Sequence, residues 1–560
     1  MDQFMIFLDK VNDVLWADAV LYVLLFVGVL FTIWSTFGQY RALTHGVAVI
    51  RGKYDLKTDP GVVNHFQALS TALSATVGLG NIAGVAIAVS LGGPGAVFWM
   101  WVTGLIGMAL KMTEVTQAML YRNVDEPDKP KGGAMWVCKR GLARINPSLA
   151  GIGTIIGGLF CITLLISTVT GGNMFQAWNV ADITRSYFGV PKIISGLIMM
   201  ILVGLVIIGG IKRIATVAGM LVPFMCVLYV LAGLFVIVVN IERVPDMFRL
   251  IFEKAFSSTE ATGAFIGGTA GYAFLKGMQR ALFSNEAGQG SAPIAHSAAK
   301  TDEPVREGVV AGLGPFIDTL CVCTITAIVI MLTGVWKAEA HLRFVRPVEI
   351  VASETAGEWT LPPTEVRMQG GDGDSASIMP GQEVFTVVIT DDPTPTGMNR
   401  QRLFGKLTES NNGGWVIVWN TVRSDSRPSL TDQSAHFDLK GATLTATAYN
   451  NVLPGLGYWI VMAAAWLFAI STMISWSYYG EQGVIYLLGN WAVYPYRTLY
   501  CILIPIASSP LIATQDQLDM LSTLGTGVML WVNIPVMLIF GRQAMREYHS
   551  YIRRWKNREF

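Results

Sequence analysis

Charged residues are scarce in this chain. Only 14% of its 560 residues are Asp, Glu, Lys or Arg, whereas a soluble protein carries roughly 25%. Hydrophobic residues make up 52% of the chain, and many apolar runs have about 20 residues, the length that crosses a bilayer as a helix. This composition excludes an ordinary soluble protein and indicates an all-α polytopic membrane protein, surrounded by lipid and without a nucleic-acid partner.

Cysteine and histidine are also few, with six of each. The cysteines fall in apolar runs or in a loop expected to be cytoplasmic, so no disulfide framework is expected. Cys321 and Cys323 have the wrong spacing for a zinc site, and the scattered histidines argue against a His-rich metal site. We find neither metal ligands nor a nucleophile with its base at membrane depth, so we do not expect an enzyme.

The apolar runs predict about eleven membrane spans. The first lies within or close to residues 1–40 and has no small-residue cleavage site after it, so we expect an extra N-terminal helix rather than a signal peptide. The seventh is too long for one straight crossing, which fits a broken helix. The predicted spans are 17–38, 66–91, 95–121, 148–177, 191–210, 214–241, 263–299, 308–335, 456–479, 493–513 and 517–541.

Lys and Arg are distributed unevenly over the loops between these spans. Most of them lie in alternate loops and in the basic tail 542–560, and the richer side of a membrane protein faces the cytoplasm. We therefore expect the N-terminus outside the cytoplasmic (inner) membrane and the C-terminus in the cytoplasm.

Residues 338–440 break the apolar pattern. Short alternating runs at 383–390, 402–408 and 415–422 are separated by turn-forming residues, which is typical of β-strands. We call this stretch the insert. It is predicted to be a small β-rich domain outside the membrane, with a structural or partner-binding role.

Residues 74–84, with the sequence SATVGLGNIAG, interrupt the second apolar run. Gly78 and Gly80 let the backbone leave helical geometry, and irregular backbone within a membrane must be buried or line a cavity. Close helix packing is the alternative explanation, because Gly80 and Gly84 also form a GxxxG pattern.

A break at this point exposes carbonyls that attract a cation and amides that attract a carboxylate. We expect the amides of residues 77–80, which include Gly78 and Gly80, to bind the carboxylate of a substrate. The expected cation ligands are the carbonyls of Ser74, Thr76 and Val77 and the side chain of Asn81.

A second interrupted segment, residues 284–290 with the sequence SNEAGQG, lies in the long seventh run. Polar side chains inside a membrane are costly unless they face a cavity or a partner. Paired interrupted helices at equivalent positions of two halves indicate the binding site of a secondary transporter.

Three long motifs stand out in the chain: GGPGAVFWMWVTGLIG at 92–107, FSNEAGQGSAP at 283–293 and WSYYGE at 476–481. In this order they resemble the motifs of the alanine or glycine:cation symporter family, which includes sodium:alanine symporters. The resemblance implies a LeuT-type fold with two inverted five-helix repeats, 66–241 and 263–335 with 441–541. The insert departs from the family pattern.

The resemblance also implies further site residues. A second sodium ion is expected between the first broken helix and the ninth span, at the Ala469 carbonyl and the Ser471 and Thr472 hydroxyls. Such hydroxyls alternatively bond to their own helix. Ser284 matches a hydroxyl ligand of a cation.

Other residues match positions that contact the substrate. The Phe283 carbonyl is expected to bind its ammonium group, and Gln176 is either a substrate contact or a polar helix end. Phe283 and Trp476 are expected to wall a small pocket, and bulky walls beside glycines favour a small substrate.

Three charged residues are candidates for charge balance near the site. Glu286 is either a cation ligand or the partner of Lys111 or Arg280 in an ion pair. Lys111 alternatively snorkels to the membrane surface. Asp318 is a buried carboxylate candidate near the cation site, or part of a proton relay.

These expectations describe a sodium-coupled symporter that carries a small neutral amino acid, alanine or glycine, into the cell. The sequence does not separate alanine from glycine, serine or the D-enantiomers. A carrier of the same fold coupled to protons or another cation, or a membrane receptor that uses the insert to bind a protein partner, remains an alternative.

Overall fold

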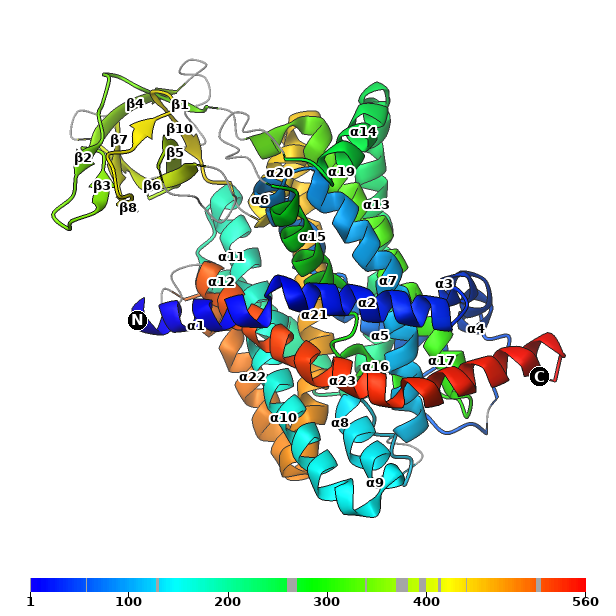
Figure 1. Cartoon of the computed structure of the whole chain (residues 1–560). Coiled ribbons are helices and arrows are strands. Elements are labelled where there is room, and N and C mark those ends of the chain that lie inside the picture. The colour runs from blue at the N-terminus through cyan, green and yellow to red at the C-terminus, as the bar shows by residue number, and fades with distance from the viewer. Residues whose placement is uncertain are drawn as a thin grey trace.

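The computed structural model describes residues 2–559 except 57, 127–129, 259–268, 338–339, 369–380, 392–398, 411–413, 440 and 510–514. Helices form most of it, and strands form a separate lobe at one end (Figure 1). The predicted start of the seventh span, 263–268, lies outside the described residues.

The helices vary from single turns to a helix of 42 residues. The α-helices are α1 (Asp2–Leu15), α2 (Asp18–Trp34), α3 (Gly38–Arg41), α4 (Val47–Ile50), α5 (His65–Thr76), α6 (Val85–Gly92), α7 (Gly95–Tyr121), α8 (Ala134–Trp136), α9 (Leu142–Ile145), α10 (Ala150–Val169), α11 (Phe175–Phe188), α12 (Lys192–Ile207), α13 (Gly210–Val239), α14 (Val244–Lys254), α15 (Ala270–Asn285), α16 (Ala292–His296), α17 (Pro304–Ala311), α18 (Leu313–Pro315), α19 (Thr324–Thr333), α20 (Gly441–Val452), α21 (Leu456–Leu488), α22 (Val493–Ala507) and α23 (Gln515–Lys556). The π- and 3-10 segments are η1 (Ala42–Gly46), η2 (Gly80–Gly84), η3 (Val137–Gly141), η4 (Pro147–Leu149), η5 (Thr170–Met174), η6 (Ile241–Arg243), η7 (Phe316–Cys323), η8 (Val335–Lys337) and η10 (Asn490–Ala492).

Within the described residues, seven helices are long and apolar enough to cross a membrane, or eight if α5 and the bent continuation η2–α6 form one span. They correspond to eight of the eleven predicted spans. The other three correspond to α12, α22, and α15 with α16, whose helices have at most 16 residues each. The multi-span helical architecture is confirmed, and the number eleven stays a prediction.

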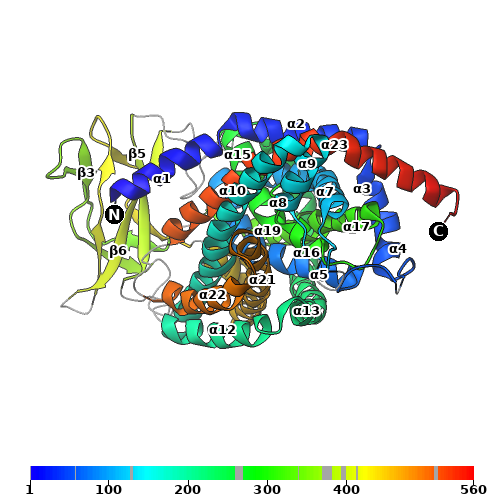
Figure 2. The same cartoon turned by 90° about the horizontal axis from the view of Figure 1, so that it is seen from below.

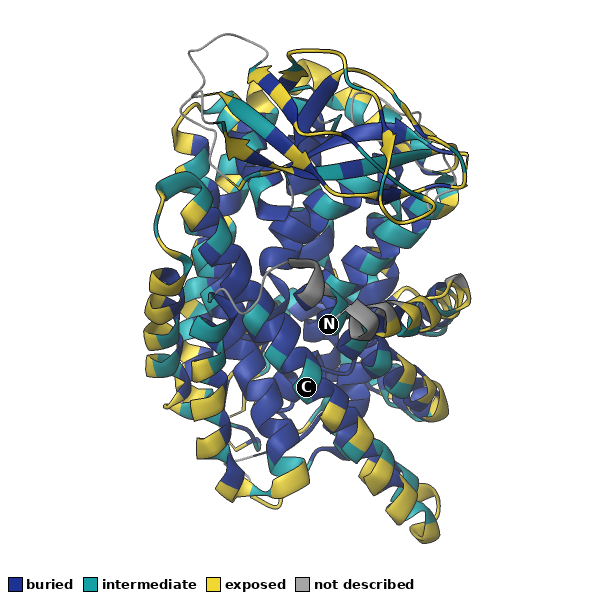
Figure 3. Cartoon of the chain, turned by 90° about the vertical axis from the view of Figure 1, so that its left-hand side faces the viewer, coloured by how far each residue is buried: buried dark blue, intermediate teal, exposed yellow. Residues whose placement is uncertain are grey.

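The outer faces of the long helices are apolar. On α13, Phe224 and Leu231 are 60% and 61% exposed, whereas Tyr229 is fully buried on the side that faces the other helices. Figure 3 shows buried residues in the centre of the helical part and exposed residues at its periphery. Large exposed apolar surfaces of this kind are typical of helices that contact lipid.

The first and last long helices pack against each other. Figure 2 shows α2 and α23 along one edge of the molecule, opposite α12 and α13. The Trp16 indole donates a hydrogen bond to the Thr523 carbonyl at 3.0 Å, and the Asn12 amide donates one to the Met520 carbonyl at 3.0 Å. The extra N-terminal helix is therefore fixed by the C-terminal one.

The first predicted break is present. Helix α5 starts with a capping box, in which Asn64 and Gln67 bond each other's backbone, and it ends at Thr76. Val77 leaves helical geometry with ψ 87°. The chain resumes as the π-helical segment η2 and then α6, bent by 51° from α5. We call residues 77–79 the first break.

The second predicted break is also present. Helix α15 ends at Asn285, and Glu286 takes a left-handed conformation with φ 54°. Gly288 and Gly290 follow with φ of 80° and 79°, which favours glycine. Helix α16 begins only at Ala292. We call residues 286–291 the second break.

The insert is a small antiparallel β domain, as predicted. Its strands are β1 (Leu342–Phe344), β2 (Val351–Ala352), β3 (Glu358–Thr360), β4 (Thr364–Met368), β5 (Glu383–Ile389), β6 (Arg400–Glu409), β7 (Trp415–Trp419), β8 (Val422–Arg423), β9 (Ser429–Leu430) and β10 (Ser434–Phe437). The larger sheet runs β10-β1-β4-β7-β6-β5-β9, and β10 also pairs with β5, which closes it around an apolar core. In its register Phe385 lies opposite Phe404. Strands β2, β3 and β8 form a second, three-stranded sheet.

Candidate functional site

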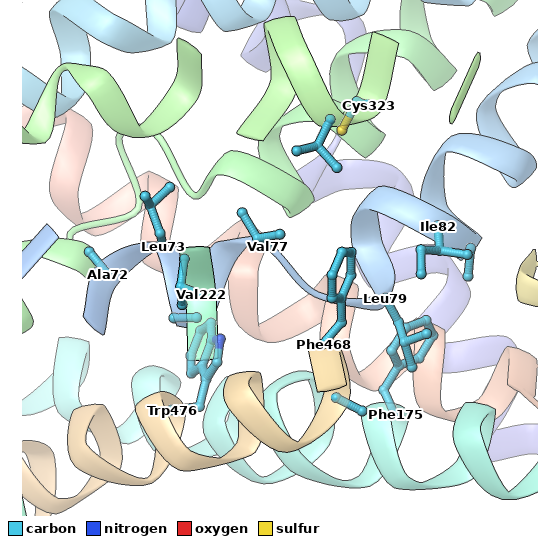
Figure 4. Packing of buried hydrophobic residues seen from close by; sticks show 14 of the residues in the cluster. Ala72, Leu73, Val77, Leu79, Ile82, Phe175, Val222, Cys323, Phe468 and Trp476 are labelled. Atoms are coloured by element: carbon cyan, nitrogen blue, oxygen red, sulfur yellow. The ribbon is translucent and has the colours of Figure 1, made fainter. Parts of the chain in front are cut away.

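A cavity lies between the two breaks, with an empty volume of about 350 Å³ including its mouth. We call it the central cavity. Besides the two breaks, eight elements contribute to it: α5, η2, α10, η5, α11, α15, α21 and α23. Figure 4 shows Trp476 of α21 and Phe175 of α11 close to the unwound segment that carries Val77 and Leu79. Its lining consists of Ala75, Thr76, Gly78, Gly80, Ser167, Gly171, Gln176, Phe283, Glu286, Thr472, Trp476, Ser522 and Thr526.

Most of the predicted substrate contacts line this cavity. The structure brings together Gly78, Gly80, Gln176, Phe283 and Trp476, which are far apart in the sequence. The predicted cation ligands Thr76 and Thr472 and the charged Glu286 also reach it. The remaining predicted ligands lie buried beside the cavity rather than in its lining; they are Ser74, Val77, Asn81, Ser284, Ala469 and Ser471.

The carboxylate of Asp318 joins the two broken helices. It is fully buried on the π-helical segment η7. The Asn81 amide next to the first break donates a hydrogen bond to its Oδ1 at 2.6 Å, and the Ser284 hydroxyl next to the second break donates to its two oxygens at 3.1 and 3.0 Å. Thr319 adds a third donor at 2.8 Å. A buried carboxylate needs such donors or a cation, because its desolvation costs several kcal/mol.

A second cluster of oxygens joins α5 to α21. The Ser74 hydroxyl donates to the Ser471 carbonyl at 2.7 Å, and the Thr472 hydroxyl donates to the Ser74 carbonyl at 3.1 Å. The Ser471 hydroxyl also bonds its own helix, at the Phe468 carbonyl 2.9 Å away. Neutral oxygens of α5 and α21 thus converge at the place where the resemblance implies a sodium ion. The alternative, in which these hydroxyls bond their own helix, is also realised for Ser471.

The amides of the first break are engaged by side chains in this conformation. The Gly78 amide donates to Asn81 Oδ1 at 2.8 Å, and the Leu79 amide donates to Gln176 Oε1 at 3.3 Å. Gln176 in turn donates to the Gly171 carbonyl at 3.0 Å. Two backbone amides of the first break thus have side-chain oxygens as their acceptors.

The second break carries a network of buried charges. Glu286 accepts a hydrogen bond from Ser291 at 2.6 Å, and Glu114 accepts one from the Gly290 amide at 3.1 Å. Lys111 lies on α7, three residues before Glu114. It is only 2% exposed, so the alternative that Lys111 snorkels to the surface is wrong.

Several polar residues at the site were missed by sequence reasoning. Ser522 and Thr526 on α23 line the central cavity, and their spacing of four residues, which places them on one helix face, was the available signal. Asn533 on the same helix donates to Glu114 and to the Gly288 carbonyl at 3.1 and 2.8 Å. The last long helix is thus part of the site.

Comparison with known proteins gives a family and several relatives. The family model described as "Sodium:alanine symporter family" matches residues 1–366 and 426–559. The unmatched residues 367–425 lie within the insert, so the departure from the family pattern is narrower than the predicted 338–440. The sodium/alanine symporter AgcS of Methanococcus maripaludis is 35% identical over 497 residues, which cover 89% of this chain and 86% of that one.

Two relatives from Bacillus subtilis differ in the substrate or ion that their names give. The putative sodium/proton-dependent alanine carrier protein YrbD is 30% identical over 551 residues, covering 98% of this chain and 93% of its own length. The probable sodium/glutamine symporter GlnT is 35% identical over 348 residues, covering 62% of this chain and 70% of its own length.

Among solved structures, a manganese transporter of Eremococcus coleocola aligns with a TM-score of 0.46 at 11% identity, covering 87% of this chain and 82% of that one.

Proposed function

Because the chain belongs to the sodium:alanine symporter family, we propose that this multi-pass membrane transporter couples inward sodium movement to the uptake of alanine or glycine. One observation carries the assignment of the site. Asp318 accepts hydrogen bonds from Asn81 and Ser284, which flank the two different breaks, beside a cavity that contains the residues predicted to contact substrate.

In the proposed mechanism, sodium binds first and orders the cavity. One ion is held by the oxygens of Ser74, Ser471 and Thr472, and a cation near Asp318 neutralises its carboxylate. The ordered state then binds the amino acid better, which is a population shift driven by differential affinity.

The substrate would bind with its carboxylate at the amides of Gly78 and Leu79 in place of the Asn81 and Gln176 oxygens. Its ammonium group would lie at the Phe283 carbonyl. The aromatic side chains of Phe283 and Trp476 leave space for a small side chain only, since excess volume is rejected by overlap.

The proposed architecture is a LeuT-type pair of inverted repeats, 66–241 and 263–335 with 441–541, preceded by the extra helix of residues 1–40. The two breaks begin the two halves, as expected for such repeats. The proposed orientation in the inner membrane has the N-terminus and the insert outside and the basic tail 542–560 in the cytoplasm.

Uptake of labelled alanine and glycine into proteoliposomes tests this function. We expect accumulation when sodium is higher outside and no accumulation when potassium replaces it in the absence of a proton gradient. Liposomes without protein are the control. Equal accumulation in both salts would contradict sodium coupling.

Proton coupling is a second candidate, favoured by the description of YrbD as sodium/proton-dependent and by the buried carboxylate of Asp318. It predicts that labelled amino acid accumulates in potassium, without sodium, when the exterior is more acidic than the interior. A protonophore should abolish this accumulation. The same proteoliposomes therefore distinguish the two ions.

A further inference from the structure

A second cavity lies where the insert meets the helical part, with an empty volume of about 310 Å³ including its mouth. We call it the insert pocket. On the insert side it is lined by Phe385 of β5, Arg402 of β6 and Asp438 after β10; on the helical side it is lined by Ser90 of α6, Trp336 of η8 and Leu444 of α20. Figure 1 shows the insert at the end of the molecule where α6 and α20 lie.

The guanidinium of Arg402 is the unusual group in this pocket. Its side chain is 14% exposed, and its Cζ lies over the Phe385 ring at 4.4 Å. The Asp438 side chain is 1% exposed, and its Oδ1 lies 3.8 Å from Nη1 of Arg402. This distance is within the range of an ion pair but longer than a hydrogen bond. The buried Nε of Arg402 has no hydrogen-bond partner among the described residues.

Arg402 is therefore a buried charge whose hydrogen-bonding capacity is only partly used by the described residues. A guanidinium has five donors in a planar fork that fits a carboxylate, and a buried charge is destabilising unless it is paired and hydrogen-bonded. Burial lowers the pKa of the Arg402 guanidinium below its ordinary value, although Asp438 opposes this shift.

We propose that the insert pocket binds a small zwitterionic amino acid, separately from the central cavity. The ligand carboxylate bonds the guanidinium of Arg402, its ammonium group bonds the carboxylate of Asp438, and its side chain contacts Phe385 and Trp336. A pocket with one buried charge of each sign suits a zwitterion better than a simple anion.

The pocket is connected to the central site through two elements. Ser90 lies on α6, which continues the first broken helix beyond Gly80. Leu444 is followed by Thr445, whose hydroxyl donates to the Ile82 carbonyl in η2 at 3.0 Å. A ligand here bridges the insert to the half helix that forms one side of the central cavity.

Equilibrium dialysis of the full-length protein with labelled L-alanine, in sodium and in potassium, tests this site. The choice of alanine as probe rests on the proposed function. We expect two alanine molecules per chain in sodium and one in potassium, where only the insert pocket is occupied. Arg402→Gln and Asp438→Asn should weaken the sodium-independent binding by at least about tenfold and leave the sodium-dependent binding in place, which also reports that the variants fold.

Arg423→Gln is the matched control, because Arg423 is an insert arginine with a side chain that is 87% exposed. It should keep both binding events. Absence of sodium-independent binding in the unaltered protein, or its persistence in Arg402→Gln, would overturn the proposal. Acetate and glycine serve as competitors for this binding. If acetate displaced alanine as effectively as glycine, the zwitterion assignment would be overturned. Loss of the sodium-dependent binding alone would contradict the proposed transport function and leave this site standing.

Discussion

Single residues decide what the central cavity can hold. Gly80 lines it, and a Cβ added there would lie 3.4 Å from Ser284 Cα and 3.6 Å from Phe283 Cδ1, which are ordinary contacts. A Cβ added at Gly78 would lie 2.5 Å from the Thr472 hydroxyl, so that side chain would have to move. The two glycines therefore differ in how much space lies beside them.

Gly80→Ala is expected to shift substrate preference toward glycine. The new methyl group reduces the space beside Phe283 without displacing its neighbours, so the ratio of glycine to alanine uptake should rise by at least about tenfold. Competition assays in proteoliposomes measure this ratio.

The matched variant Gly78→Ala should instead reduce uptake of both substrates, because Thr472 would no longer bond the Ser74 carbonyl. An unchanged substrate ratio in Gly80→Ala would contradict the placement of the substrate.

Asp318→Asn tests the role of the buried charge. The substitution keeps the shape of the side chain but removes the negative charge next to the proposed cation. The sodium concentration that gives half-maximal uptake should therefore rise by at least about tenfold. Sodium titrations of alanine uptake give this value. Cys323→Ala is the control, because the Cys323 thiol contacts Asn81 at 3.2 Å without carrying charge. A sodium dependence that is unaltered in Asp318→Asn would remove Asp318 from the ion site.

At the scale of elements, the broken helices depend on their fixed ends. Helix α5 presents its carbonyl end to the site, and its other end is held by the capping box of Asn64 and Gln67, with bonds of 2.8 and 3.2 Å. The π-helical segments η2 and η7 carry Asn81 and Asp318 at the point where the two elements meet. Such π-helical segments often occur at functional sites.

Asn64→Ala removes the cap and should lower the free energy of unfolding by about 1 kcal/mol. Thermal unfolding in detergent micelles measures the loss. Asn64→Asp retains an acceptor for the Gln67 amide and should unfold close to the unaltered protein. Equal midpoints for the Ala and Asp variants would show that the cap contributes nothing to stability.

At the scale of the whole molecule, the insert is an attached domain with its own core. Its larger sheet closes on itself through the β10–β5 pairing. It follows η8 and precedes α20 in the chain, and these two elements pack against each other. Loops at such positions tolerate insertion and removal.

Replacing residues 340–438 by a short flexible linker should therefore leave sodium-dependent uptake through the central cavity intact. The same variant should lose the sodium-independent alanine binding proposed for the insert pocket. Uptake and dialysis on one preparation give both results. Loss of uptake in a correctly folded variant would show that the insert is required for transport.

The sequence by itself determined the class of protein, the two breaks and the β domain. Glycines and polar residues inside apolar runs can only be accommodated by irregular, enclosed backbone, and strict alternation between turns is specific to strands. The predicted run 383–390 became β5, and 402–408 lies within β6. These patterns involve residues close together in the chain, so they can be recognised without a tertiary structure.

Only the tertiary structure decided how the site is assembled. Asp318 lies 237 residues from Asn81 and 34 from Ser284, and no pattern along the chain shows that all three meet. Lys111 is enclosed rather than at the surface, and Ser522 and Thr526 of the last long helix reach the central cavity. Such contacts follow from the packing of distant helices, which depends on the shapes of whole faces rather than on the spacing of neighbouring residues.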